Sequence, residues 1–288
     1  MAPKPIVFRN QLAWQIAQPD GGASVVRVPD HPKSAQLGFW IDGFKSAVVK
    51  ALEPLARTDI FVDVGANWGQ TMLEMYALNP EIRYFGFEPN AEPFAYLQDL
   101  AKANRIHASL FPWACADQAK PLQLYRTNAL DSSATTQPSI RPDTYEQADG
   151  DWIAAYTLDQ SLPEEMGANF ILKIDVEGGE NEVLEGAARM LTRQRPWILC
   201  EVLHAHRESE FGLNNIRKKM LEKILDHFEY AIYQCLLSAQ EREHLMGFQL
   251  IRQFQRSQLW AESPNTCDYL FVPRELENEF IREVLSRI

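Results

Sequence analysis

Two glycines close an apolar run near the start of the chain and mark a candidate ligand-binding loop. The run Asp59-Ile-Phe-Val-Asp-Val-Gly-Ala-Asn-Trp-Gly-Gln-Thr71 predicts a buried strand that turns into a helix. We expect Gly65 to permit the tight turn and Gly69 to permit close approach of a ligand to the backbone. The amides of the helix N-terminus would point at that ligand, and Asp63 would accept hydrogen bonds from an amino group or orient the loop.

The glycine spacing of this loop distinguishes between kinds of ligand. Its G-x-x-x-G pattern lacks the third glycine of the dinucleotide fingerprint, in which a pyrophosphate sits on the helix, and it lacks the lysine of a P-loop. A ligand without a phosphate, such as S-adenosylmethionine, fits the loop better. Taken alone, the loop is also compatible with an ordinary strand-to-helix turn.

Acidic residues end the next two predicted strands. The run Tyr84-Phe-Gly-Phe-Glu-Pro-Asn90 places Glu88 where a strand-end acid accepts both ribose hydroxyls in nucleotide sites of this topology. For Glu88 the alternative is a helix-start acid, although the following Pro-Asn already signals that start. Asp117 ends the following strand, where it would lie near an adenine or make a turn.

A fourth predicted strand delivers several charges to the same edge of the sheet. The run Phe170-Ile-Leu-Lys-Ile-Asp-Val-Glu-Gly-Gly-Glu180 holds Lys173, Asp175 and Glu177 around a glycine pair. Burying such charges without partners would be costly, so they either pair with one another or face a site. We favour the site.

A possible metal site comes from the next strand end, Glu201-Val-Leu-His-Ala-His206. Asp175, Glu201 and His204 could together hold Mg²⁺, which would acidify a hydroxyl group. The alternative is that this segment is a solvated polar turn.

The elements that must position these residues alternate between strand and helix patterns. Such alternation predicts an α/β fold with a mostly parallel sheet. The stretch from Ser238 to Arg256 reads as polar, and the stretch from Asn128 to Gly150 as a long loop. We divide the chain into an N-terminal cap, residues 1–56, and a main domain, residues 57–288, with that loop inserted near 128–150.

The expected strands are 60–64, 84–87, 107–114, 170–174, 197–202, 230–236 and 268–272. The expected helices are 38–55, 70–78, 93–103, 181–191 and 213–227.

The amino-acid composition limits the classes of binding partner that we expect. A formal net charge of −11 argues against nucleic acid, which binds clustered Lys and Arg. No run is long and apolar enough for a signal peptide or a membrane span, and the four cysteines have no CxxC spacing. We therefore expect a cytoplasmic protein with reduced thiols and no membrane contact. The sequence leaves the oligomeric state open, and a homo-oligomer is compatible with it.

The motifs FVDVGANWGQT, FEPN, YTLDQ, LKIDVEGGE and ILCEV resemble successive motifs of FkbM-type methyltransferases. The resemblance covers about residues 60–202. It implies a Rossmann-like class I methyltransferase fold, with a mostly parallel seven-stranded sheet and an antiparallel C-terminal strand. The departures are Trp68, at a position often aliphatic or small, and the second glycine of the pair Gly178-Gly179, where Ala is common.

Carried over residue by residue, the resemblance implies a cofactor, S-adenosylmethionine, and an acceptor site. Asp175 and Glu177 would face the acceptor, with His204 a further candidate base. The cofactor candidates are Asp63, Gly65, Asn67, Gly69, Glu88, Asn90 and Asp117.

The function that the resemblance implies is O-methylation of a hydroxyl on a sugar, glycan or other natural-product small molecule. A carboxylate or histidine would take up the acceptor's proton during in-line transfer. The alternatives are N-methylation of an amine or amide, an NAD-dependent oxidoreductase, and a non-catalytic binding module.

Overall fold

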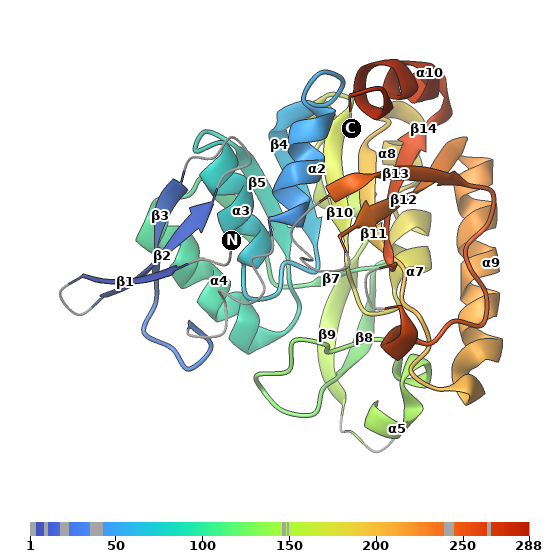
Figure 1. Ribbon diagram of the computed structural model, residues 1–288. Coiled ribbons are helices and arrows are strands. Elements are labelled where there is room, and N and C mark those ends of the chain that lie inside the picture. The colour runs from blue at the N-terminus through green and yellow to red at the C-terminus, as the bar shows by residue number, and fades with distance from the viewer. Residues whose placement is uncertain are drawn as a thin grey trace.

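An eight-stranded sheet forms the centre of the computed structural model (Figure 1). The structure describes residues 4–8, 11–17, 23–34, 43–145, 148, 150–238, 245–263 and 266–287. The strand order is β13-β12-β14-β11-β10-β4-β5-β6. The strands are β4 (Arg57–Val64), β5 (Arg83–Phe87), β6 (Ala108–Phe111), β10 (Phe170–Ile174), β11 (Trp197–Glu201), β12 (Tyr230–Leu237), β13 (Leu245–Ile251) and β14 (Asp268–Pro273).

Strand directions confirm a mostly parallel sheet. The pairs from β6 through β11 are parallel, whereas β14 runs antiparallel to both β11 and β12. The expected count of seven strands is wrong by one, because β13 pairs with the outer side of β12. This strand arises from the stretch that we treated as polar. Only Phe248 among its large apolar side chains is buried, so its pattern is weak.

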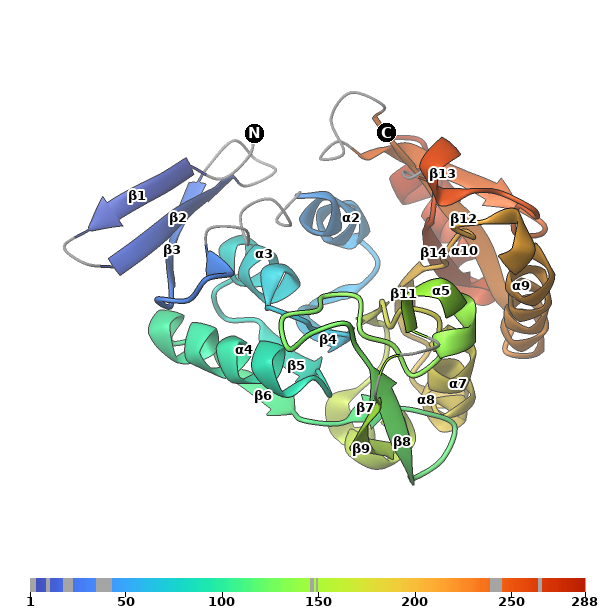
Figure 2. The same ribbon diagram turned by 90° about the horizontal axis from the view of Figure 1, so that it is seen from below.

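Helices cover both faces of the sheet (Figure 2). The central strands are apolar on both faces, as parallel strands under two helical layers must be. Along β4, Phe61 joins one core cluster, and Ile60 and Val62 join the other. One face carries α2 (Phe44–Leu52), α3 (Gln70–Leu78) and α4 (Ala91–Asn104), and the other carries α7 (Glu180–Glu185), α8 (Ala188–Arg193) and α9 (Phe211–His227).

No helix within the described residues is both long and apolar enough to cross a membrane.

The N-terminal residues form a small antiparallel sheet, β1 (Lys4–Phe8), β2 (Gln11–Ala17) and β3 (Ala23–Val28). Ser24 Oγ donates to the carbonyl of Ala77 at 3.4 Å, and Arg27 N–H donates to Asn104 Oδ1 at 2.6 Å, so β3 lies against α3 and α4. The core cluster on that face contains residues of β3 and α2, so the core continues across residue 56. The division into a cap and a main domain stays a prediction, and residues 38–42 of the expected first helix lie outside the described residues.

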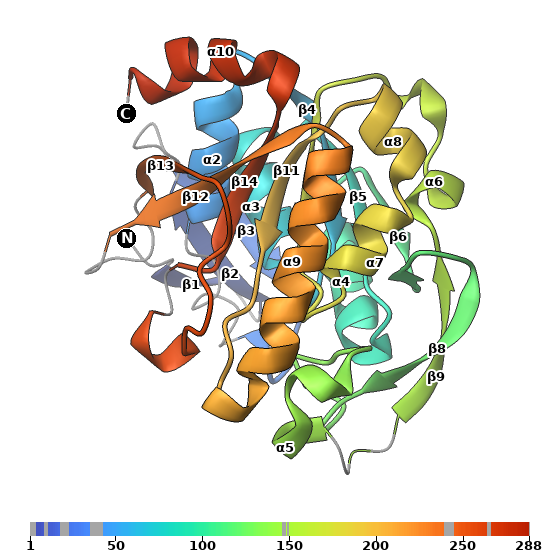
Figure 3. The same cartoon turned by 90° about the vertical axis from the view of Figure 1, so that its right-hand side faces the viewer.

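A second small sheet extends beyond the carboxyl ends of the central strands, where it lies close to α5 (Pro142–Tyr145) (Figure 3). It contains β7 (Ala114–Cys115), β8 (Lys120–Tyr125) and β9 (Gly150–Tyr156). The strand expected over 107–114 is therefore wrong beyond Phe111, since Pro112 cannot donate to a ladder and the chain leaves the central sheet there. The segment 126–145, which contains the short helices η1 (Pro138–Ile140) and α5, connects β8 to β9.

The helix expected over 181–191 breaks at Gly186 into α7 and α8. A Cβ atom at Gly186 would lie 2.0 Å from the backbone oxygen of Ala116. The break thus allows two backbones to pack closely, which no side chain at this position would permit.

We predict that Gly186→Ala lowers the free energy of unfolding by about 1–3 kcal/mol, the usual cost of overpacking. Gly212→Ala is the matched control, because nothing lies within 4 Å of its Cβ position on α9 and Ala favours helix by up to about 1 kcal/mol. Urea unfolding measures the free energy of unfolding of both variants. Equal stability of Gly186→Ala and wild type would contradict this reading of the break.

Candidate active site

A pocket of about 870 Å³ lies at the carboxyl ends of β4, β5 and β10 and is open to solvent. The sequence-predicted residues that line it are Gly65, Asn67, Glu88, Asn90, Asp117, Asp175 and Glu177. Asp63, Gly69 and His204 do not line it.

Glu88 is the most constrained acid on this pocket. Its side chain is only 7% exposed, and its two oxygens accept the backbone N–H groups of Asn67 at 2.9 Å and Asn90 at 2.8 Å. Burial raises the pKa of Glu88 to about 7. The strand-end acid therefore ties the loop after β4 to the loop after β5 and still has unused lone pairs on the pocket.

Asp63 lies beneath the loop instead of on the pocket. It is fully buried, accepts a hydrogen bond from Tyr84 Oη, and lies 2.9 Å from Lys173 Nζ. Lys173 Nζ also donates to the carbonyl of Gly65 at 2.9 Å and lies 3.3 Å from Asp175. Asp63 therefore lies off the pocket, and through Lys173 it is joined to the carbonyl of Gly65 in the loop.

The two loop glycines serve different contacts. Gly65 has φ +84°, and a Cβ there would lie 1.8 Å from the backbone oxygen of Asp175, so glycine lets the loops after β4 and β10 touch. A Cβ at Gly69 would meet the side chains of Leu97 and Leu100 at 2.8 Å. Gly69 thus permits close packing of α3 on α4 and not approach by a ligand, which corrects the sequence-based role.

The apolar wall of the pocket was not predicted from the sequence. Trp113 packs against Phe111 in a tilted arrangement with ring centroids 4.9 Å apart, and Phe111 stacks on Phe87 at 4.7 Å. Trp113, Cys115, Leu122 and Leu124 line the pocket on this side. The proline before Trp113 was the available signal, because it ends β6 and turns the chain outward.

The segment 126–145 also lines the pocket, through Asp131, Ser132, Ala134, Thr136 and Gln137. Asn67 Nδ2 donates to the carbonyl of Ser132 at 2.9 Å, and Asn90 Nδ2 donates to that of Asp131 at 3.2 Å. Thr135 Oγ1 donates to the carbonyl of Glu177 at 2.7 Å. The expected long loop is therefore a strap across the site, held at both ends of the pocket.

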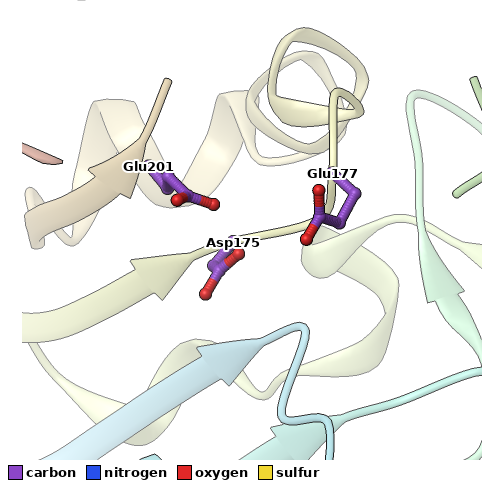
Figure 4. A group of neighbouring side chains, drawn as sticks. All are labelled: Asp175, Glu177 and Glu201. Atoms are coloured by element: carbon purple, nitrogen blue, oxygen red, sulfur yellow. The ribbon is translucent and has the colours of Figure 1, made fainter. Parts of the chain in front are cut away.

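Three carboxyl groups converge beside the pocket, from Asp175, Glu177 and Glu201 (Figure 4). One oxygen of each lies within 4.8 Å of the others, a spacing that could also hold a cation. Burial raises the pKa of Glu177 to about 7, although Arg141, 2.7 Å away, opposes this shift.

Asp175 and Glu201 are close neighbours whose pKa values move in opposite directions. Burial and the neighbouring Asp175 raise the pKa of Glu201 well above its usual range. Burial also disfavours the charge on Asp175, but Lys173, together with Glu201 and Lys45, outweighs burial and lowers the pKa of Asp175. Of the two groups, Asp175 therefore loses its proton more readily.

His204 lies outside the carboxylate group and does not line the pocket, so the structure does not bring it together with Asp175 and Glu201 as the predicted base and metal ligand. Its ring nitrogens contact Thr266 Oγ1 at 2.8 Å and Lys218 Nζ at 3.3 Å. Burial, with Lys218 nearby, lowers the pKa of His204 to about 4. The residue is only 1% exposed and fills the core between β11 and α9.

We predict that Lys173→Met destabilises the protein by about 3–5 kcal/mol, because it leaves the buried Asp63 carboxylate without its cation. Lys120→Met is the control: the Lys120–Asp117 pair is about one-third exposed, and loss of such a pair costs at most about 1 kcal/mol. Urea unfolding distinguishes the two. Recovery of stability in Lys173→Met with Asp63→Asn would confirm the cause, and a loss as small as the control's would exclude it.

Comparison with known proteins places this chain among methyltransferases. A family model described as "Methyltransferase FkbM domain" matches residues 63–235. The chain is 28% identical over 156 aligned positions to 31-O-demethyl-FK506 methyltransferase FkbM of Streptomyces tacrolimicus, covering 44% of this chain and 59% of that protein.

Two solved structures are also similar. Methyltransferase FkbM from Methylobacillus flagellatus KT is 14% identical, with 84% of this chain and 55% of that chain covered and a TM-score of 0.43. Fibrillarin from Aeropyrum pernix, solved with natively bound S-adenosyl-L-methionine, is 14% identical. The match covers 93% of this chain and 98% of the fibrillarin chain, with a TM-score of 0.41.

This chain spans just over half the length of each of the two FkbM proteins. The matched model itself covers more than half of this chain and includes the loop after β4, Glu88, the three convergent carboxyl groups and the strap. The resemblance seen in the sequence is confirmed: the chain belongs to the FkbM methyltransferase family and has the Rossmann-like α/β fold of class I methyltransferases.

Proposed function

We propose that the protein is an S-adenosylmethionine-dependent O-methyltransferase that acts on a hydroxyl of a sugar, glycan or natural-product small molecule. The observation that carries the proposal is the position of Glu88, a buried strand-end acid with free lone pairs on a pocket beside three carboxyl groups. The relative in Streptomyces is named for an O-demethylated natural product. A net charge of −11 disfavours nucleic acid as the substrate. The cytoplasmic location and the oligomeric state stay predictions.

The residues present fit each part of the cofactor. Glu88 would accept both ribose hydroxyls, and the wall of Trp113, Cys115 and Leu122 would pack on the adenine. Gly65 and Asn67 would lie along the methionine end. When bound, S-adenosylmethionine supplies an electrophilic methyl group on a sulfonium.

The carboxyl groups explain how the acceptor loses its proton. Asp175 is held ionised by Lys173 and lies on the pocket, so it can accept a hydrogen bond from an acceptor hydroxyl and then its proton. Glu201, whose raised pKa favours its protonated form, lies beside Asp175 and would donate a hydrogen bond that orients that carboxylate. Glu177, fixed by Arg141, would accept a second hydroxyl and align the acceptor for in-line attack.

The same groups favour a hydroxyl over an amine. Nearby carboxylates raise the pKa of an amine and hold it as an ammonium, which has no lone pair for attack. A hydroxyl is neutral and gains nucleophilicity from the same carboxylates. The proposal requires no Mg²⁺, because Lys173 and Arg141 already pair with Asp175 and Glu177.

We predict that S-adenosylhomocysteine binds with micromolar affinity at pH 8 and that Glu88→Gln weakens this binding about 10- to 100-fold, because hydrogen bonds to a charged acceptor are worth about 1.5–3 kcal/mol. Isothermal titration calorimetry, with EDTA and then with Mg²⁺, measures the affinity. Glu185→Gln, at an exposed position on α7, is the control and should bind as wild type does. Absence of binding, or tighter binding of NAD⁺, would refute the cofactor assignment.

The pH dependence gives an independent check on the role of Glu88. Ribose hydroxyls donate to the ionised carboxylate, and the pKa of Glu88 is raised to about 7, so below pH 7 binding must first remove a proton. We predict that wild-type affinity falls towards tenfold per pH unit below pH 7 and levels off above it. In Glu88→Gln the part of this slope due to Glu88 should vanish. An unchanged slope in the variant would assign the titration to another group.

A further inference from the structure

A pair of stacked aromatic rings lies on the surface beyond the carboxyl end of β11. The rings of His206 and Trp260 have centroids 5.8 Å apart and planes inclined by 26°. Trp260 is 37% exposed, although tryptophan is a large apolar side chain. Burial and the Arg141 guanidinium lower the pKa of His206, so its ring is neutral at pH 7.

Backbone hydrogen bonds hold this pair on the chain that continues from β11, a few residues beyond Glu201. The segments that leave β11 and lead into β14 run side by side, with Val202 N–H donating to the carbonyl of Cys267 at 2.7 Å. Further out, Trp260 N–H donates to the carbonyl of Ala205 at 2.8 Å, and Ala205 N–H to that of Gln258 at 3.2 Å. The rings therefore project from the strand end that carries Glu201.

The strap joins the same surface from the other side. Arg207, next to His206, forms an ion pair with Asp143 of α5. Arg141, just before α5, binds Glu177 at 2.7 Å and acts electrostatically on His206. Arg141 thus pairs with one of the carboxyl groups and is near enough to His206 to influence its charge.

We propose that His206 and Trp260 form a stacking wall of the acceptor subsite, and that the acceptor is a neutral, ring-shaped polyhydroxyl compound of the pyranoside type. This inference rests on the proposed function and narrows its substrate class. The face of a tryptophan ring packs on the C–H face of a sugar ring, while carboxyl groups beside it accept the sugar's hydroxyls.

Charge pairing favours this class over a cationic acceptor, which could also use an aromatic face. Asp175 has Lys173 as its cation, and Glu177 has Arg141. A further cation would lie close to Arg141. A neutral ligand that offers several hydroxyl groups makes use of the carboxyl groups without adding charge.

The experiment is saturation-transfer NMR on the protein saturated with S-adenosylhomocysteine, which detects millimolar binding. The probes are methyl β-D-glucopyranoside, methyl α-D-mannopyranoside and methyl α-L-rhamnopyranoside, with choline as the cationic probe. Variants are Trp260→Ala and, as the matched control, Trp152→Ala, which removes another exposed tryptophan, 71% exposed on β9. Calorimetry measures the affinity of wild type and of each variant for S-adenosylhomocysteine.

We expect saturation transfer to the ring protons of at least one pyranoside, an at least tenfold weaker signal in Trp260→Ala, and an unchanged signal in Trp152→Ala. S-adenosylhomocysteine should bind all three proteins equally. Binding of S-adenosylhomocysteine with no pyranoside signal, an equal pyranoside signal in Trp260→Ala, or Trp260-dependent binding of choline alone would overturn the inference and leave the proposed function standing. Failure of S-adenosylhomocysteine to bind wild type would overturn both.

Discussion

The buried ammonium of Lys173 joins the two strand ends on which the site is built. It lies 2.9 Å from both Asp63 and the carbonyl of Gly65, at the end of β4, and 3.3 Å from Asp175, at the end of β10. Burial disfavours the charge of Lys173, but the two carboxylates outweigh it and raise its pKa. One buried cation thus orients the loop that faces the cofactor pocket and keeps the proposed base ionised. Glycine at position 65 is needed for the same reason, because these strand ends touch through their backbones.

The strap makes the pocket and the carboxyl groups parts of one structure. Its backbone carbonyls accept hydrogen bonds from Asn67 and Asn90, on the pocket side. Its side chains Thr135 and Arg141 bind the main chain and the carboxylate of Glu177, on the other side. Residues from four separated parts of the chain therefore depend on one another for their positions.

Local patterns predicted the elements well and their contacts poorly. The strand β10 and the helix α3 match their predicted bounds, and Glu88 lines the pocket as expected, since a strand-end acid is placed by its own strand. Asp63, Gly69 and His204 lie off the pocket because they contact Lys173, the α4 leucines and Thr266, which are far from them in the sequence. The break at Gly186 has the same origin, since it depends on the backbone of Ala116. Sequence spacing indicates which strand end a residue occupies. It does not indicate whether the side chain there already contacts another residue of the protein.

The hydrogen bonds between the strap and the two asparagines have a kinetic consequence. Asn67 and Asn90 border the pocket and donate to carbonyls of the segment that lies across it. A ligand that passes beneath that segment must break both hydrogen bonds, and the free energy of this opening then adds to the barriers for its binding and its release. Residence time and turnover would accordingly depend on two amide side chains that take no part in bond making or breaking.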